Sequence, residues 1–480
     1  MKQSSSGGAV HVVMVPTPFQ GHLTPFVHLA LKLASHGFTV TFLNTHATHA
    51  NLIRSAAAAG ESAPDIFSDA RSRSGLDIRY ALIGDGFPLG FDPSTNQEQF
   101  IHGLFHVFSA HVDDFIDRLR RRSDVDPPVS CLLTDSFFVW PSMVAEKHGL
   151  LNVSFWTQSA LVFAMYLHKE DLLTAHRHFG VIKPRDLPSP LQNPEGPWNT
   201  VDTYVLKSLE DAVKADIIVS NTAFELESST ITALQQDRPF YAVGPVSRFG
   251  LPEAAATVPT SFRSESPDCR PWLDARPENS VLYVSFGSLI NVDKHVIHEI
   301  ARGLALSGVS FLWAMRRDIT GSSADEPDLF PAGFGGEIEG RGLVVPWCDQ
   351  TEVLSHRATG GFLTHCGWNS VLESVWCRVP MLCFPLCSDQ PTSRRLVVED
   401  WKVGINLCDG GTVEREEVRE KTNRLMSRGE TREGLGEKMK TTQEKLQRAV
   451  CANGSSEKHL EAFMHELKLK TQQKLNFTEK

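Results

Sequence analysis

The chain has 480 residues, a length that corresponds to roughly two to four domains at about 150 residues each. Its composition is that of a globular protein, with 41% hydrophobic and 22% charged residues. The 47 Lys and Arg residues against 57 Asp and Glu residues give a net charge of −10. This balance disfavours nucleic acid and anionic membrane surfaces as the main partners, although it leaves room for a local basic pocket.

Neither a membrane span nor a signal peptide is expected. No apolar run approaches the roughly 20 residues that cross a bilayer, and the apolar run at residues 10–15 is short and ends at Pro16. The nine cysteines are scattered between Cys131 and Cys451 without a CxxC pair, which is typical of buried, reduced thiols. We therefore expect a cytoplasmic protein and a monomer.

The first half of the chain begins with a strand–helix–strand pattern. Residues 10–15 are predicted as a buried strand, Pro25 as the start of a helix, and residues 38–43 as a second strand. Such a unit implies a parallel sheet with a right-handed crossover. Further strands are predicted, with helical patterns between them, at residues 129–134, 153–156 and 217–220.

The second half repeats this organisation after a break. Gly, Pro, Ser and charged residues dominate residues 247–277, which we interpret as a linker. Strands are then predicted at residues 281–286, 311–315, 343–346, 361–364, 381–385 and 403–407. The fold class is therefore α/β, with two doubly wound domains at residues 1–246 and 278–454. Residues 455–480 are predicted as a helix that frays after Lys468.

Ligand sites of doubly wound domains lie at the carboxyl ends of the strands. His22 follows the first strand of the chain, and Asp135 follows the strand at residues 129–134. If these strands are neighbours, Asp135 can accept a hydrogen bond from one imidazole nitrogen and leave the other as a base. Helix capping is the alternative interpretation for each of the two residues.

A second candidate site follows the predicted strand at residues 361–364. Backbone N–H groups at the start of the next helix form an anion site, to which His365, Asn369 and Ser370 add side-chain donors. Glu373 lies on the first turn of that helix, and Trp347 is placed to stack on a base. These residues predict a ligand that carries phosphate.

Other nucleotide and metal motifs are absent or weak. The sequence has neither a GxGxxG motif at the first strand–helix junction nor a GxxxxGK[ST] motif, so dehydrogenase and P-loop interpretations are disfavoured. Asp124 and Asp126 form an acid-x-acid pair that lies in a predicted solvated loop. His102 and His106 have helical spacing without a third ligand, which indicates an ordinary helix face.

The 44-residue segment from Trp347 to Gln390 resembles the signature box of plant family-1 UDP-glycosyltransferases. It contains the run HCGWNS and ends in an acid–Gln pair. Supporting matches cover much of the chain, at residues 18–22, 85–88, 241–245 and 283–288. The resemblance implies a GT-B fold, in which two Rossmann-like domains face each other across a cleft and the last helix packs back on the N-terminal domain. It also implies UDP-glucose as co-substrate, a small-molecule acceptor, and neither a metal ion nor another cofactor.

The resemblance assigns His22 as general base and Asp135 as the carboxylate that orients it. It gives the donor site to residues of both domains: Trp347, Cys348 and Gln350 at uracil, Glu373 at the ribose, Ser288, His365, Gly367, Asn369 and Ser370 at the diphosphate, and Thr157, Trp368, Asp389 and Gln390 at the sugar. In this family, Gln at the position of Gln390 usually accompanies glucose. The implied reaction inverts the anomeric carbon.

The acceptor is the least determined part of the prediction. Six phenylalanines of the N-terminal domain could line an apolar pocket for a flavonoid, another phenolic compound or a terpenoid, or could equally belong to the core: Phe19, Phe87, Phe91, Phe137, Phe138 and Phe163. Attack from oxygen and attack from an aromatic carbon are both open. A non-catalytic UDP-sugar-binding protein is the alternative function, although such a protein has no need of a base at position 22.

Four positions depart from the family pattern. Cys377 and Arg378 stand where Ala and Gly are common, Arg357 replaces a frequent Pro, and Cys348 replaces a frequent Ala. None removes a group that the chemistry needs.

Overall fold

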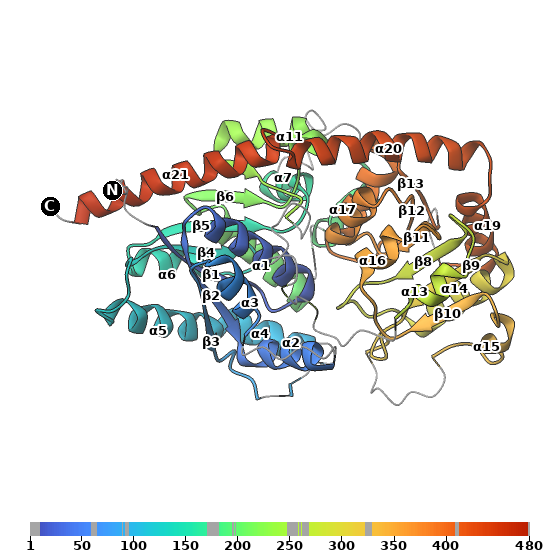
Figure 1. Cartoon of the computed structure of the whole chain (residues 1–480), viewed down its shortest axis with the longest axis horizontal. Helices are drawn as coiled ribbons and strands as arrows, with labels where there is room; N and C mark the ends of the chain where they lie inside the picture. The colour runs from blue at the N-terminus through green and yellow to red at the C-terminus, as the bar shows by residue number, and fades with distance from the viewer. Residues whose placement is uncertain are drawn as a thin grey trace.

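The protein consists of two lobes that lie side by side (Figure 1). The computed structural model describes residues 10–58, 65–88, 90–91, 96–169, 182–193, 196, 198–246, 258, 261, 268–321, 329–408 and 412–478. The N-terminal lobe contains a seven-stranded sheet and the C-terminal lobe a six-stranded one. Most of the linker predicted at residues 247–277 lies outside the described residues, so the proposed domain boundaries stay predictions.

All strands of the N-terminal sheet are parallel, and their spatial order is β3-β2-β1-β4-β5-β6-β7. Their bounds are β1 His11–Val15, β2 Thr39–Thr45, β3 Ile78–Ile83, β4 Val129–Asp135, β5 Leu151–Trp156, β6 Ile217–Ser220 and β7 Phe240–Ala242. The order reverses between β1 and β4. This switch point is where doubly wound sheets open a crevice for ligands.

The C-terminal sheet repeats the same winding, with the order β10-β9-β8-β11-β12-β13. Its strands are β8 Val281–Ser285, β9 Ser310–Ala314, β10 Gly342–Val345, β11 Thr359–Thr364, β12 Met381–Cys383 and β13 Gly404–Asn406. The switch point here lies between β8 and β11, which pair in parallel.

The eleven strands predicted from sequence are confirmed, because parallel strands covered on both faces are continuous apolar runs. Two strands, β3 and β7, were not predicted from the sequence. The outer strand β3 is only half-buried over its four central residues, and β7 has just three residues.

Helices cover both sheets. In the N-terminal lobe these are α1 Gln20–Ser35, α2 His46–Ala58, α3 Ser68–Ser74, α4 Gln97–His106, α5 Phe108–Arg121, α6 Pro141–Lys147, α7 Ala160–Leu167, the 3-10 helix η1 Pro184–Asp186, α9 Ser189–Gln192, α10 Thr200–Ala212 and α11 Phe224–Asp237. In the C-terminal lobe they are α13 Arg270–Asp274, α14 Lys294–Ser307, α15 Phe334–Glu337, α16 Gln350–Ser355, α17 Trp368–Trp376, α18 Gln390–Arg395, the π-helical turn η2 Leu396–Asp400, α19 Arg415–Met426 and α20 Glu430–Val450. The last helix, α21 Ser455–Thr478, packs on the N-terminal lobe.

The predicted start of the first helix at Pro25 is wrong, because α1 begins five residues earlier and contains Pro25. His22 therefore lies in the first turn of a helix rather than in a loop. The side chain is held by regular backbone, which fixes its direction more firmly than a loop would.

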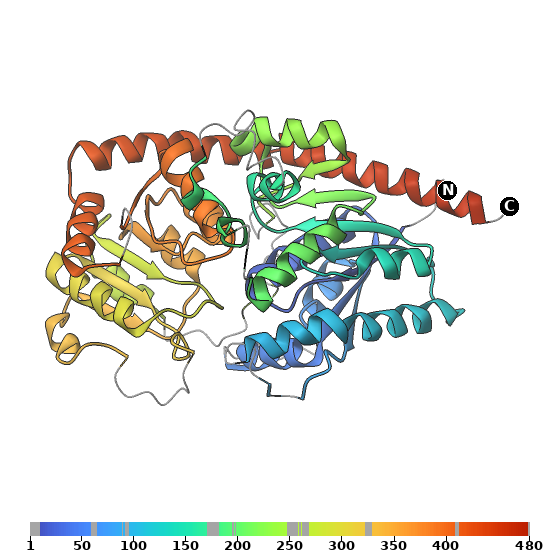
Figure 2. The ribbon, with the colours of Figure 1, turned by 180° about the vertical axis from the view of Figure 1, so that it is seen from behind.

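The last two helices run along one edge of both lobes, as the front and rear views show (Figures 1 and 2). Helix α21 lies beside β7, where Ser456 donates to the carbonyl of Gly244 at 2.5 Å. The predicted fraying after Lys468 is wrong, since α21 continues to Thr478. Lys474 anchors the last turns by donating to the carbonyl of Leu150 at 2.6 Å. Within the described residues, no helix is long and apolar enough to cross a membrane.

Helix α17 ends in a motif that explains one departure from the family pattern. The N–H of Val379 bonds the carbonyl of Ser374 at 2.9 Å, and the N–H of Arg378 bonds that of Val375 at 3.1 Å. This is the Schellman arrangement, which places Arg378 at φ 60°. Glycine adopts such a backbone freely, whereas an L side chain there costs roughly 1–2 kcal/mol. Arg378 is exposed and carries this strain.

Replacing Arg378 with glycine should therefore raise the free energy of unfolding by about 1 kcal/mol, after allowance for the extra freedom of glycine in the unfolded chain. Urea unfolding followed by circular dichroism measures this. Arg419, exposed within α19, is the matched control, since R419G should lower stability by about 1 kcal/mol. Destabilisation of similar size by both substitutions would contradict the assignment of strain to Arg378.

Candidate active site

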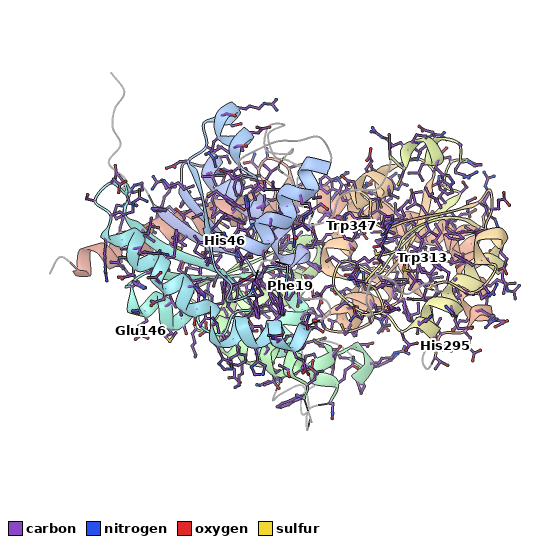
Figure 3. All side chains as sticks on the ribbon, turned by 90° about the horizontal axis from the view of Figure 1, so that it is seen from below. Phe19, His46, Glu146, His295, Trp313 and Trp347 are labelled. Atoms are coloured by element: carbon purple, nitrogen blue, oxygen red, sulfur yellow. The ribbon has the colours of Figure 1, made fainter. Side chains whose placement is uncertain are left out.

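The switch points of the two sheets contribute to one cavity between the lobes. Its volume is about 440 Å³, within the range of small-molecule sites. Phe19 and Thr157 line it from the N-terminal lobe, and Trp347 and His365 line it from the C-terminal lobe. Figure 3 labels Phe19 and Trp347 on the two facing lobes. Both regions that the sequence singled out thus open into a single space.

A histidine–carboxylate pair lies at the N-terminal switch point. Strands β1 and β4 are neighbours, so the loop after β1 and the end of β4 meet. Nδ1 of His22 lies 2.8 Å from Oδ2 of Asp135 and 3.2 Å from the hydroxyl of Thr157. Asp135 is fully buried, while the His22 side chain is 16% exposed and lines the cavity. With Nδ1 so engaged, Nε2 on the other side of the ring is the nitrogen available to a ligand.

The environment of the pair stabilises the protonated imidazole more than in a free histidine, so the pKa of His22 is raised. Burial by itself would lower the pKa of His22, but the charge and the hydrogen bond of Asp135, with a smaller contribution from Asp389, outweigh burial and raise it above 6.5. Asp135 also accepts hydrogen bonds from the backbone N–H groups of Phe137 at 3.0 Å and Thr17 at 3.4 Å. Its carboxylate is therefore fixed in place, and it in turn fixes the orientation of the ring.

Pro25 creates a contact between the lobes beside His22. Proline has no N–H, so it cannot donate to the carbonyl of Gly21 four residues earlier. Nδ2 of Asn369 donates to that carbonyl instead, at 2.7 Å. The same side chain accepts from Nδ2 of Asn221 at 3.2 Å. Asn369, which the resemblance assigns to a diphosphate, thus uses its amide to join α17 to the N-terminal lobe.

The start of α17 lines the cavity from the C-terminal lobe. Its first backbone N–H groups, after Gly367, lack intrahelical partners and carry the positive end of the helix dipole. Burial lowers the pKa of His365 to about 4, so its ring is neutral at pH 7. A Cβ at Gly287 or at Gly367 would come within 2.6 or 2.5 Å of its Nε2. Both glycines therefore let the imidazole approach the backbone.

Gln350 connects two of the predicted donor-site residues. Its amide nitrogen lies 2.9 Å from the hydroxyl of Ser370 and 2.8 Å from Oε2 of Glu373. The indole N–H of Trp347 donates to Ser261 at 3.0 Å. Cys348 is buried, and its Sγ lies 3.6 Å from the hydroxyl of Tyr283. All of these residues line the cavity, and Tyr283 does so from strand β8.

The remaining donor-site candidates lie near the boundary of the lobes. Burial raises the pKa of Asp389 to about 6. Oε1 of Gln390 accepts from the backbone of Leu386 at 2.8 Å, which fixes the amide plane. Trp368 is buried and donates its indole N–H to the carbonyl of Asn221 at 2.7 Å. Ser288 lines the cavity from the loop after β8.

The six candidate phenylalanines separate into three groups. Phe19 and Phe137 line the cavity. Phe87 and Phe91 stack on each other at 4.3 Å and are not among the residues that line the cavity; Phe87 packs against Phe100, which in turn packs against Phe19. Phe138 and Phe163 are core residues with at most 1% exposure, packed against Trp140 and Trp156 respectively.

Sequence reasoning missed several residues of the wall. Asn221 directly follows β6, so its position at the carboxyl edge of the sheet was a usable signal. Val201, Tyr204 and Val205 form one face of α10, with the spacing of a helical stripe. The sequence pattern of such a stripe is the same whether the helix faces a core or a cavity, so it did not identify these residues as part of the wall. Within the part of the chain that the structure describes, no cluster of three or more His, Cys, Asp or Glu side chains suits a metal ion.

Comparison with known proteins shows the family of the chain. Residues 262–413 match the family described as "UDP-glucoronosyl and UDP-glucosyl transferase", and residues 8–65 match "Glycosyltransferase, N-terminal domain". UDP-glycosyltransferase 86A1 of Arabidopsis thaliana is 50% identical over 97% of this chain and 96% of its own length.

Two solved structures are similar over almost the whole chain. Os79 from O. sativa in complex with UDP has a TM-score of 0.81 at 25% identity and covers 95% of this chain and 100% of its own. Phytolacca americana UGT2, complexed with UDP-2fluoro-glucose and pterostilbene, has a TM-score of 0.72 at 26% identity and covers 96% and 100%. The predicted GT-B fold class is confirmed.

The electrostatics of the histidine–carboxylate pair give a direct prediction. D135N removes the charge that offsets burial, so the pKa of His22 should fall, and its imidazole should lose its proton at lower pH than in the wild type. NMR titration of ¹³C-labelled histidine measures the shift, with H22Q used to assign the signal. T157V removes a neutral neighbour of the same nitrogen and should leave the pKa almost unchanged. An unchanged titration in D135N would show that Asp135 does not set the charge of the ring.

Proposed function

Because this chain belongs to the plant family-1 UDP-glycosyltransferases, we propose that it transfers glucose from UDP-glucose to a small apolar acceptor and inverts the anomeric carbon. The observation that carries the proposal is the shared cavity, which His22 with its buried carboxylate lines from one lobe and the start of α17 lines from the other. The acceptor is a flavonoid, another phenolic compound or a terpenoid. Its nucleophile is a hydroxyl group, with an aromatic carbon as the alternative.

His22 acts as the general base. The acceptor hydroxyl attacks the anomeric carbon while its proton passes to Nε2 of the neutral imidazole, and the bond from that carbon to the diphosphate oxygen breaks on the opposite face. Asp135, held at 2.8 Å from Nδ1, stabilises the imidazolium that forms. An α-linked donor thus yields a β-glycoside and UDP.

The leaving diphosphate gains negative charge and needs a fixed positive environment. The backbone N–H groups at the start of α17 supply it, together with the neutral ring of His365, which offers a hydrogen bond rather than a charge. Ser288, Gly367, Asn369 and Ser370 surround the same position in this proposal. Because these groups are already oriented, the reaction requires little reorganisation.

Donor recognition extends along both lobes. Trp347 stacks on uracil, with Cys348 and Gln350 at the rim of the base, and Glu373 binds the ribose hydroxyls. Thr157, Trp368, Asp389 and Gln390 surround the sugar. The contact of Gln350 with both Ser370 and Glu373 supports this arrangement, since it links the ribose group to the diphosphate group.

Support for the acceptor class comes from the wall around His22. Phe137 packs edge-on against the imidazole at 4.9 Å, and Phe19 lies at 6.1 Å on another side. A flat apolar molecule fits between such rings. Phytolacca americana UGT2 carries pterostilbene and a fluorinated UDP-glucose in its structure, which is consistent with this choice.

A screen of UDP-sugars against phenolic and terpenoid acceptors, with products identified by mass spectrometry, tests the function. We expect a product heavier by one hexose and the release of one UDP, with the β-configuration visible as a large H1–H2 coupling in proton NMR. Binding of UDP-glucose without any product across the panel would favour the non-catalytic alternative.

Removal of the base should separate chemistry from binding. H22A should lower the rate of transfer by roughly 100- to 10,000-fold, while the dissociation constant for UDP-glucose changes little, because the ring touches the reacting hydroxyl rather than the nucleotide. W347A is the matched control and should weaken donor binding. Comparable loss of donor binding in H22A would refute the role of His22.

A further inference from the structure

A buried ion-pair cluster joins the lobes directly behind the proposed sugar site. The carboxylate of Asp186, at the end of η1 in the N-terminal lobe, is fully buried. It contacts the guanidinium group of Arg394 on α18 of the C-terminal lobe. Its other oxygen lies 3.8 Å from Nε of Arg395. Two arginines of one lobe thus converge on one carboxylate of the other.

Backbone hydrogen bonds reinforce the same junction. The hydroxyl of Thr392 donates to the carbonyl of Asp186 at 2.7 Å, and the N–H of Ser189 donates to the carbonyl of Ser388 at 2.9 Å. The segment around η1 and the first residues of α18 are therefore connected by side chains and backbone together. A rigid connection of this kind fixes both the position and the rotation of α18.

Helix α18 is short: residues at its start line the cavity, and the arginines at its end belong to the ion-pair cluster. It begins at Gln390, after the N-cap residue Asp389, and ends at Arg395. One helical turn, about 6 Å, separates Gln390 from Arg394. Asp389 faces the cavity and interacts electrostatically with His22. A shift of the arginines would consequently move the residues assigned to the sugar.

We propose that Asp186 is a positioning residue for donor recognition: through Arg394 and Arg395 it fixes α18 so that Asp389 and Gln390 meet the sugar of the donor. This inference rests on the proposed function, since it concerns the sugar end of that site. Asp186 itself does not line the cavity.

Neighbouring carboxylates lead us to expect that the chain folds without the charge of Asp186. The π-helical turn after α18 brings Glu399 within 3.2 Å of Arg394 and Asp400 within 3.1 Å of Arg395, each five residues along the chain. Both arginines keep a carboxylate when Asp186 is neutralised. D186N therefore changes how α18 is held more than whether it forms.

Binding of UDP and of UDP-glucose, measured by calorimetry, tests the proposal. The two nucleotides differ only by the sugar, so the ratio of their dissociation constants isolates its recognition. We expect D186N to weaken UDP-glucose relative to UDP by about tenfold, within the 5- to 150-fold typical of coupled sites, and to leave UDP binding nearly unchanged. The turnover number should fall in parallel.

E299Q is the matched control. Glu299 is another buried carboxylate paired with an arginine, Arg415, but it joins α14 to α19 away from the cavity. Its substitution should cost stability and leave the ratio unchanged. T392V removes one hydrogen bond of the junction and should shift the ratio in the same direction by a few fold, which preserves the test if D186N does not fold.

Equal weakening of both nucleotides in D186N, or the same change of ratio in E299Q, would overturn the proposal. Failure of the wild-type protein to bind UDP-glucose or to transfer glucose would instead overturn the proposed function. The two failures are thus distinguishable.

Discussion

The hydrogen bond between His22 and Asp135 is the contact on which the site depends. It exists because β1 and β4 are adjacent at the point where the sheet reverses its order, although 113 residues separate the two side chains in sequence. The bond selects the free ring nitrogen, and the buried carboxylate raises the pKa of the imidazole against the effect of burial. In the reaction that we propose, the positions of the acceptor hydroxyl and of the UDP-sugar are defined relative to that nitrogen.

A few polar contacts fix the distance between this pair and the C-terminal lobe. Because Pro25 has no N–H, the carbonyl of Gly21 lacks its intrahelical donor, and Asn369 donates to it instead. A proline within α1 thus leads to a contact with the other lobe. Trp368 and Asn221 add a second contact at 2.7 Å. Since the residues that make these bonds line the cavity, the same contacts hold the two lobes together and shape the site.

Much of the fold could be predicted because parallel strands covered on both faces are continuous apolar runs, and because two such series imply two doubly wound sheets. The half-buried β3 and the three-residue β7 lack this signal. The start of α1 was missed because Pro25 is typical of a first turn, yet its missing N–H is compensated from the other lobe. The sequence placed His22 and Asp135 after two strands that prove to be neighbours, whereas residue type could not separate Phe137 in the cavity wall from Phe138 in the core.

The charges around the cavity act in opposite senses at two places. Around the ring of His22, two carboxylates, Asp135 and Asp389, favour a proton on the imidazole. At the start of α17, the free backbone N–H groups and a neutral His365 favour negative charge on a ligand. In glycosyl transfer by direct displacement, a proton arrives at the base while an electron pair leaves with the diphosphate. In the mechanism that we propose, these charges therefore favour both movements, and a reversed charge at either place would oppose the reaction even with every contact to the sugar kept.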